Sequence, residues 1–190
     1  MTPQDGTASA SLRRLVSIEL QTDRLRLRPI AAADRKALHA LWTEPAVRRF
    51  LWDDRVIDLA SVDGLIERST ASFAAEGFGL FALREAGRAA LRGAVGIFRL
   101  RPEGEPELLY SLATACFGRG LATEASRAVM ADAFERLGFV RVLARTDPLN
   151  LASIAVMKRL GMKYAGESME SGLPTVSYAL AREDWQRAPR

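Results

Sequence analysis

The chain of 190 residues contains one cysteine and one histidine, and this scarcity excludes several kinds of functional site. Cys116 has no second cysteine with which to form a disulfide within the chain or a cysteine-based metal cluster. His39 lies in a predicted helix at residues 34–42, far in sequence from any candidate nucleophile. We therefore expect neither a Ser-His-Asp hydrolase nor a zinc site, and we predict no bound metal.

Long apolar runs are also missing, and the first eighteen residues lack the apolar stretch of a signal peptide. We expect a cytoplasmic protein with no membrane partner, in which residues 1–20 are a flexible N-terminal tail and residues 21–190 are one domain. Only three of the 27 basic residues are lysine, and the net charge of +4 favours anionic ligands. No basic run contains interleaved aromatic residues, so no nucleic-acid partner is expected.

The most informative pattern is a predicted strand at residues 107–113, a glycine turn and a predicted helix at residues 121–137. Gly118 and Gly120 allow the backbone to approach an anion closely, and the first helical turn offers free N–H groups. No Gly-Lys-Ser/Thr follows, and no third glycine stands at the dinucleotide spacing. The pattern indicates a phosphate site that is neither a P-loop nor a dinucleotide fingerprint.

Hydrophobic periodicity predicts the element order β-α-α-β-β-β-α-β-α-β-β, which is typical of an α+β fold. Between the first two helices, Glu44 and Pro45 are expected to break the chain, and an aromatic loop is expected to follow them. The last two strands are predicted to be short, at residues 163–165 and 175–180. The next-to-last predicted helix begins at Asn150, a residue favoured at N-caps.

Four segments together resemble the GNAT superfamily of acetyl-CoA-dependent N-acetyltransferases: residues 22–29, 107–124, 147–154 and 158–162. The closer resemblance is to its branch of ribosomal-protein N-terminal acetyltransferases (RimJ/RimL-like), over residues 21–187. It implies a GNAT-like fold with a central, mostly antiparallel, splayed sheet flanked by about four helices. It also implies acetyl-CoA as co-substrate, and it assigns cofactor binding to Leu112, Ala113, Gly118, Arg119, Gly120, Leu121, Ala122, Thr123 and Asn150.

Acetyl transfer to an amine needs a proton acceptor for the amine and a donor for the leaving thiolate. Glu107 is the candidate base, at the position of a glutamate in the branch, although Glu103 or Glu105 could compete. Many GNAT enzymes carry a tyrosine acid where this chain has Met157, so Ser153 is the candidate donor. Tyr110 and Cys116 are the alternatives.

The acceptor is the least defined part of the prediction. The resemblance implies that the loop after Pro45 lines the acceptor groove, with Phe50, Leu51, Trp52, Asp53 and Asp54 in it. Trp52, Asp53 and Asp54 are the predicted acceptor residues, and the two carboxylates would attract a cationic amine. The substrate could be a small-molecule amine or a protein N-terminus, and the resemblance allows a homodimer. Two rival functions stay open: a non-catalytic acyl-CoA-binding module and a basic nucleic-acid-binding domain.

Overall fold

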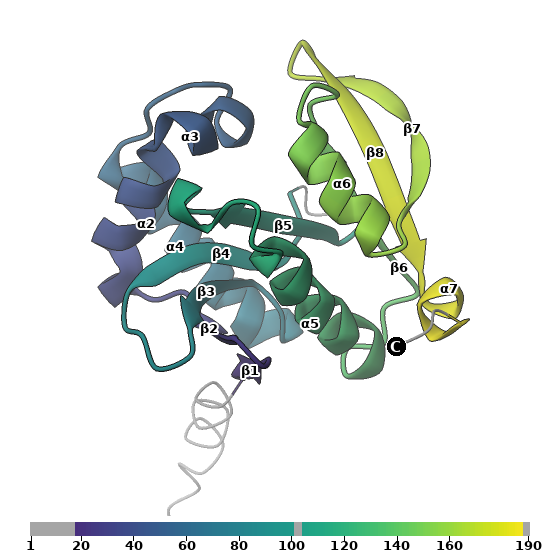
Figure 1. The fold of residues 1–190 in the computed structure, drawn as a ribbon, viewed down its shortest axis with the longest axis horizontal. Helices are drawn as coiled ribbons and strands as arrows, with labels where there is room; N and C mark the ends of the chain where they lie inside the picture. Colours follow the sequence, from purple (N-terminus) through teal and green to yellow (C-terminus); the bar gives the residue numbers. More distant parts are fainter. Residues whose placement is uncertain (1–17, 101–103, 188–190) are drawn as a thin grey trace, which may run out of the picture.

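A computed structural model describes residues 18–100 and 104–187 of the chain. They form one eight-stranded sheet in the order β1-β2-β3-β4-β5-β6-β8-β7 (Figure 1). The neighbouring strands are antiparallel except for β5 and β6, which are parallel. The strands are β1 (Leu20–Gln21), β2 (Leu25–Pro29), β3 (Leu80–Glu85), β4 (Leu91–Phe98), β5 (Glu107–Leu112), β6 (Arg141–Thr146), β7 (Lys163–Glu170) and β8 (Leu173–Ala181).

Helices cover both faces of this sheet, so the predicted α+β class is confirmed. One apolar cluster lies between the sheet and α5 and α6, and a second lies between the sheet and α2, α3 and α4. The described residues form six α-helices rather than about four. They are α2 (Arg35–Thr43), α3 (Pro45–Leu51), α4 (Leu59–Glu76), α5 (Leu121–Glu135), α6 (Leu151–Arg159) and α7 (Arg182–Arg187).

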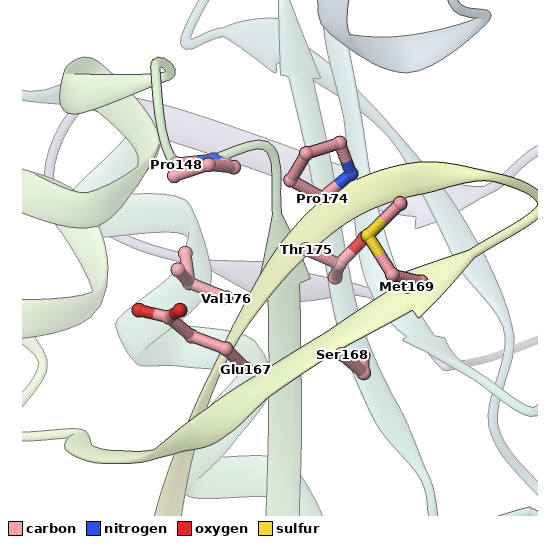
Figure 2. Close-up of a pocket in the computed structure, with 7 residues that line it drawn as sticks. All are labelled: Pro148, Glu167, Ser168, Met169, Pro174, Thr175 and Val176. Atoms are coloured by element: carbon pink, nitrogen blue, oxygen red, sulfur yellow. The ribbon is translucent and has the colours of Figure 1, made fainter.

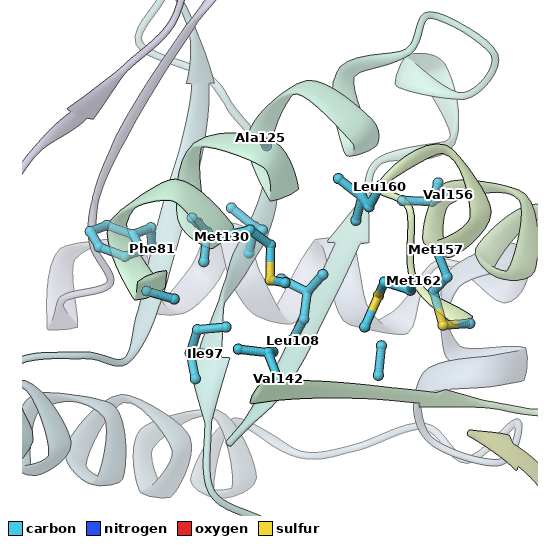
Figure 3. Close-up of a cluster of buried hydrophobic side chains, with 14 of the residues drawn as sticks. Phe81, Ile97, Leu108, Ala125, Met130, Val142, Val156, Met157, Leu160 and Met162 are labelled. Atoms are coloured by element: carbon cyan, nitrogen blue, oxygen red, sulfur yellow. The ribbon is translucent and has the colours of Figure 1, made fainter. Parts of the chain in front are cut away.

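The larger apolar cluster fixes α5 and α6 against β5 and β6 (Figure 3). Leu108 of β5, Met130 of α5 and Val142 of β6 meet in it, and each is almost completely buried. Met157 of α6 is also fully buried in this cluster. The residue at the position of the family's tyrosine acid is therefore a core side chain.

The sheet opens between β5 and β6, as the resemblance implied. Within the described residues, these strands share the single register pair Glu107 and Leu143, next to a hydrogen bond from Leu143 N to Pro106 O. Beyond this point they diverge, because β5 continues along β4 while β6 pairs with β8 over residues 141–146. The divergence leaves one edge of β5 without a neighbouring strand.

Several boundaries differ from the sequence prediction. Pro45 does not start a loop but occupies the first turn of α3, where its missing N–H costs nothing. β7 extends to Glu170 because it pairs with β8 along its length, an interaction that short-range propensity does not reveal. The helix α7 and the short strand β1 were not predicted.

The domain boundary is only partly described. The predicted tail at residues 1–20 lies mostly outside the described residues, but Leu20 already belongs to β1 and packs against the core. Among the helices of residues 18–100 and 104–187, none is both long and apolar enough to cross a bilayer.

Candidate active site

A cleft of about 1040 Å³ opens where β5 and β6 diverge. Its walls come from α3, β5, the residues around Gly118 and Gly120, the first turn of α5, the end of β6, and α6. In Figure 1, α3 and α6 stand on opposite sides of this opening, and α5 begins at its near edge. Segments that are more than 100 residues apart in sequence therefore meet at one site.

The glycine turn has the backbone conformation that its residues suggested. Gly118 and Gly120 have φ angles of 72° and 75°, in the left-handed region that side chains disfavour. Gly120 is the N-cap of α5, and the first helical hydrogen bond runs from Glu124 N to Gly120 O. The N–H groups of Leu121, Ala122 and Thr123 precede that bond and line the cleft with the positive end of the helix dipole. These features fit a pyrophosphate group.

The basic residue at this turn is Arg24 rather than Arg119. The Arg119 side chain does not line the cleft, because it forms an ion pair of 2.6 Å with Glu85. Arg24 lines the cleft, donates to Arg119 O at 3.1 Å and pairs with Glu124. The pKa of Glu124 is lowered, since its hydrogen bonds from Thr22 and Arg24 outweigh the opposing effect of burial. Sequence reasoning missed Arg24 because 95 residues separate it from the turn.

Two further arginines, Arg127 and Arg159, also line the cleft, so its loop end carries positive charge. Arg127 donates to the main-chain oxygen of Arg159 at 3.1 Å and so links α5 to the end of α6. A one-turn spacing from Glu124 to Arg127 was the only sequence signal that placed Arg127 beside the turn.

The free edge of β5 explains which backbone groups face the opening. Ala113, which the sequence predicted for this site, donates its N–H to Arg92 O, so its amide faces β4, and the residue does not line the cleft. Because the hydrogen-bonding direction alternates along an antiparallel strand, Tyr110 and Leu112 turn their backbone groups to the other edge. Leu112, which the sequence predicted for this site, lines the cleft, and Tyr110 lines it as well.

Two hydroxyl groups meet at the centre of the cleft. The Tyr110 hydroxyl lies 2.7 Å from Ser153 Oγ and donates to Ser153 O at 3.0 Å. Burial raises the pKa of Tyr110 to about 12, against a smaller lowering by the bond to Ser153. Asn150 caps α6, because its side-chain oxygen accepts from Ser153 N at 3.1 Å, and it lines the cleft. The sequence predicted Ser153 and Asn150 as site residues, but it did not predict that Ser153 contacts Tyr110.

The structure places Glu107 away from the cleft wall. Its side chain is 3% exposed, at the point where β5 and β6 are still paired. Its carboxylate lies 3.2 Å from Arg145, which also forms an ion pair of 3.1 Å with Glu170. Arg145 lines the cleft, but Glu107 does not. The ion pair and the burial disfavour the predicted role of Glu107 as a base.

One wall of the cleft is formed by α3 rather than by the residues after it. Ala46, Val47, Phe50 and Leu51 line the cleft. Trp52, Asp53 and Asp54, which the sequence predicted for this site, do not line it. Trp52 packs edge-on against Trp42, whereas Asp53 pairs with Arg55 and Asp54 pairs with Arg48. The apolar spacing of Val47, Phe50 and Leu51 was the helical signal that the loop assignment overlooked.

A second, smaller cavity of about 300 Å³ lies on the β7–β8 hairpin, below the turn that precedes α6 (Figure 2). Pro148, Met169 and Pro174 form its apolar wall, and Glu167 is its one acidic residue. None of these residues lines the main cleft. Within the described residues, no three His, Cys, Asp or Glu side chains form a cluster that could hold a metal ion.

The family model for the acetyltransferase (GNAT) domain matches residues 24–163. The chain belongs to the GNAT acetyltransferase family. The matched residues include the open edge of β5, the glycine turn and the N-terminus of α6, so the family assignment covers the cleft described above.

Individual proteins and solved structures are also similar to this chain. A solved acetyltransferase from Agrobacterium tumefaciens is 29% identical, covers 86% of this chain and 95% of its own, and has a TM-score of 0.77. YkkB of Bacillus subtilis is 27% identical over 84% of this chain and 94% of its own. RimL, a ribosomal-protein α-N-acetyltransferase solved with coenzyme A, covers 86% of this chain and 97% of its own with a TM-score of 0.73. At 18% identity, it shows a shared fold alone.

Proposed function

We propose that this protein transfers an acetyl group from acetyl-CoA to a primary amine by direct attack in a ternary complex. The observation that carries this proposal is the continuous cleft that runs from the glycine turn to the open edge of β5. An anionic head group fits one end and an extended chain fits the other, which matches the two parts of a coenzyme A molecule.

In this proposal the N–H groups of residues 118–123 hold the pyrophosphate, and Arg24 adds charge beside them. The free backbone edge at Leu112 and Tyr110 pairs with the pantetheine arm as a strand would. Asn150 and Ser153 stand at the reacting end, where the hydroxyl of Ser153 can donate to the sulfur atom. The acceptor enters past the apolar face of α3.

We further propose that the amine arrives at the thioester already neutral. The acidic side chains that line the cleft within the described residues are Asp23 and Glu124, and both lie at the glycine-turn end. An α-amine of pKa near 8 is neutral in roughly a fifth of molecules at pH 7.4, but a lysine amine of pKa near 10.4 is neutral in about one in a thousand. The cleft therefore suits a protein N-terminus or another amine of low pKa, as in the RimJ/RimL-like branch.

The test compares two peptides of one sequence. The first has a free α-amine and no lysine, and the second has an acetylated N-terminus and one lysine. We expect coenzyme A release at pH 7.5 to be at least about tenfold faster with the first peptide, and the difference to narrow as the pH rises to 9.5. A preference for lysine at pH 7.5 would contradict the acceptor assignment.

A thermal-shift titration with acetyl-CoA, combined with the activity assay, distinguishes acetyl transfer from the non-catalytic binding function. Stabilisation by acetyl-CoA without acetylation of any amine would favour the non-catalytic acyl-CoA-binding module. No stabilisation at millimolar acetyl-CoA would contradict both proposals.

A further inference from the structure

We propose that Tyr110 and Ser153 form a hydroxyl pair that holds the coenzyme A thiolate as it leaves. Ser153 is the donor to sulfur, and Tyr110 is the positioning residue that orients the Ser153 hydroxyl. This inference rests on the proposed function, and it assigns the thiolate-binding group to a contact between β5 and α6.

The contact joins the two sides of the opening. Tyr110 belongs to β5 and Ser153 to the first turn of α6, and both side chains line the cleft. Their hydroxyl oxygens are 2.7 Å apart, which is an ordinary distance for an O–H···O hydrogen bond. The bond from Ser153 N to Asn150 fixes the helix turn that carries the serine. Met157 occupies the position where many GNAT enzymes carry a tyrosine donor, and its side chain is buried in the core.

The two hydroxyl hydrogens allow two arrangements of the pair. Each hydroxyl has one hydrogen to donate. In the first arrangement Tyr110 donates to the main-chain oxygen of Ser153, 3.0 Å away, and Ser153 donates to Tyr110. In the second, the Tyr110 hydrogen turns to Ser153 Oγ, and the Ser153 hydrogen becomes free to point into the cleft. Negative charge on a sulfur atom beside Ser153 favours the second arrangement.

The pair stabilises the thiolate by hydrogen bonding and transfers no proton. Burial raises the pKa of Tyr110 to about 12. A proton transfer from this phenol to a thiolate of pKa near 8.5 would be unfavourable by roughly three-thousandfold. The amine lone pair attacks the acetyl carbon, the C–S bond breaks, and its electron pair stays on sulfur. Water accepts the proton lost by the new amide nitrogen, and the thiolate takes a proton from water on release.

The test compares the binding of coenzyme A with that of desulfo-coenzyme A, which lacks the sulfur atom, by calorimetry between pH 6.5 and 9.5. Both ligands meet the same charged and ionisable groups of the protein, including Cys116, Glu124 and Arg145 in the cleft, so the effect of these groups cancels in the comparison. The affinity for coenzyme A divided by the affinity for desulfo-coenzyme A therefore reports the preference of the site for thiolate. We expect this ratio to rise by about tenfold over the pH range in the wild type, which corresponds to about 1.4 kcal/mol.

Tyr110→Phe and Ser153→Ala should each reduce the rise to about twofold or less, and the double variant should reduce it no further. Tyr178→Phe is the matched control, because it removes a phenol hydroxyl from a buried tyrosine outside the cleft. A purely structural role of Tyr110 would change the melting temperature or both affinities equally, and it would leave the ratio unchanged.

The outcomes separate this inference from the proposed function. The hydroxyl pair is overturned if coenzyme A binds but the affinity ratio stays constant with pH, or if the ratio rises as much in Tyr110→Phe as in the wild type. Either result leaves acetyl transfer intact. Absence of coenzyme A binding overturns both. With an active acceptor in hand, kcat should fall by about tenfold in Tyr110→Phe at unchanged acetyl-CoA affinity, and a normal kcat would count against the pair.

Discussion

Replacing Glu107 by glutamine decides between a catalytic and a structural role for this residue. The change keeps the shape of the side chain and removes its charge. Glu107 is 2% exposed and pairs with Arg145 at 3.2 Å. Because the residue lies outside the cleft wall, we expect the variant to lose stability and to keep its kcat per folded molecule within about twofold.

The size of the stability loss follows from the surroundings of Arg145. Removing one partner of a buried ion pair costs about 3–5 kcal/mol when the other charge is left without compensation. Arg145 keeps its ion pair with Glu170, and its side chain is 22% exposed to water. We therefore expect a smaller loss of about 1–3 kcal/mol, equivalent to roughly 2–4 °C in melting temperature for each kcal/mol.

Calorimetric melting and a pH–rate profile measure the two effects separately. Glu170→Gln is the matched control, because it removes the more exposed partner of the same arginine and should cost less. The reasoning fails if Glu107→Gln folds normally but loses about a hundredfold in kcat, with recovery at high pH. That result would restore Glu107 as the base.

Three further predictions concern the cleft and the core. Gly120→Val should weaken acetyl-CoA binding at least about tenfold by calorimetry, whereas Gly87→Val, at φ 72° in open space outside the cleft, should cost stability alone. Met157→Ala should lower the free energy of unfolding by about 2–5 kcal/mol in denaturant titrations while kcat per folded molecule is kept. Phe50→Ala should raise KM for the acceptor in steady-state kinetics without changing acetyl-CoA affinity, and a changed affinity would move Phe50 to the cofactor side.

Local signals predicted the parts of the fold that depend on one segment. Gly118 and Gly120 take left-handed conformations that few other residues tolerate, and Asn150 caps a helix through its own side chain. These requirements are visible in sequence because they involve neighbouring residues. The family resemblance added the opening between β5 and β6, which local propensity alone does not predict.

Long-range contacts determined what the sequence prediction missed. Arg24 reaches the glycine turn from the bend just before β2, and Tyr110 meets Ser153 across the opening. The sequence did not show that the Ala113 amide faces β4, because the edge of a strand that a backbone amide faces depends on the pairing register, which a one-residue shift reverses. The partner of Glu107 lies on another strand, so its burial in an ion pair could not be deduced from the residues around it.

The sheet consists of two units, because β5 and β6 share a single register pair. Strands β6, β8 and β7 with helix α6 form a C-terminal unit that pairs with β5 only at Glu107 and Leu143 within the described residues. Elsewhere the unit contacts β5 through side chains, among them the Tyr110–Ser153 hydrogen bonds and the Glu107–Arg145 ion pair. A molecule that lies along the free edge of β5 would complete the sheet. Its binding would therefore stabilise the C-terminal unit against local unfolding. Amide hydrogens of β6 and β8 should then exchange faster than those of β3 and β4 in the free protein. Acetyl-CoA should slow them most, although β8 lies beyond the strands that line the cleft.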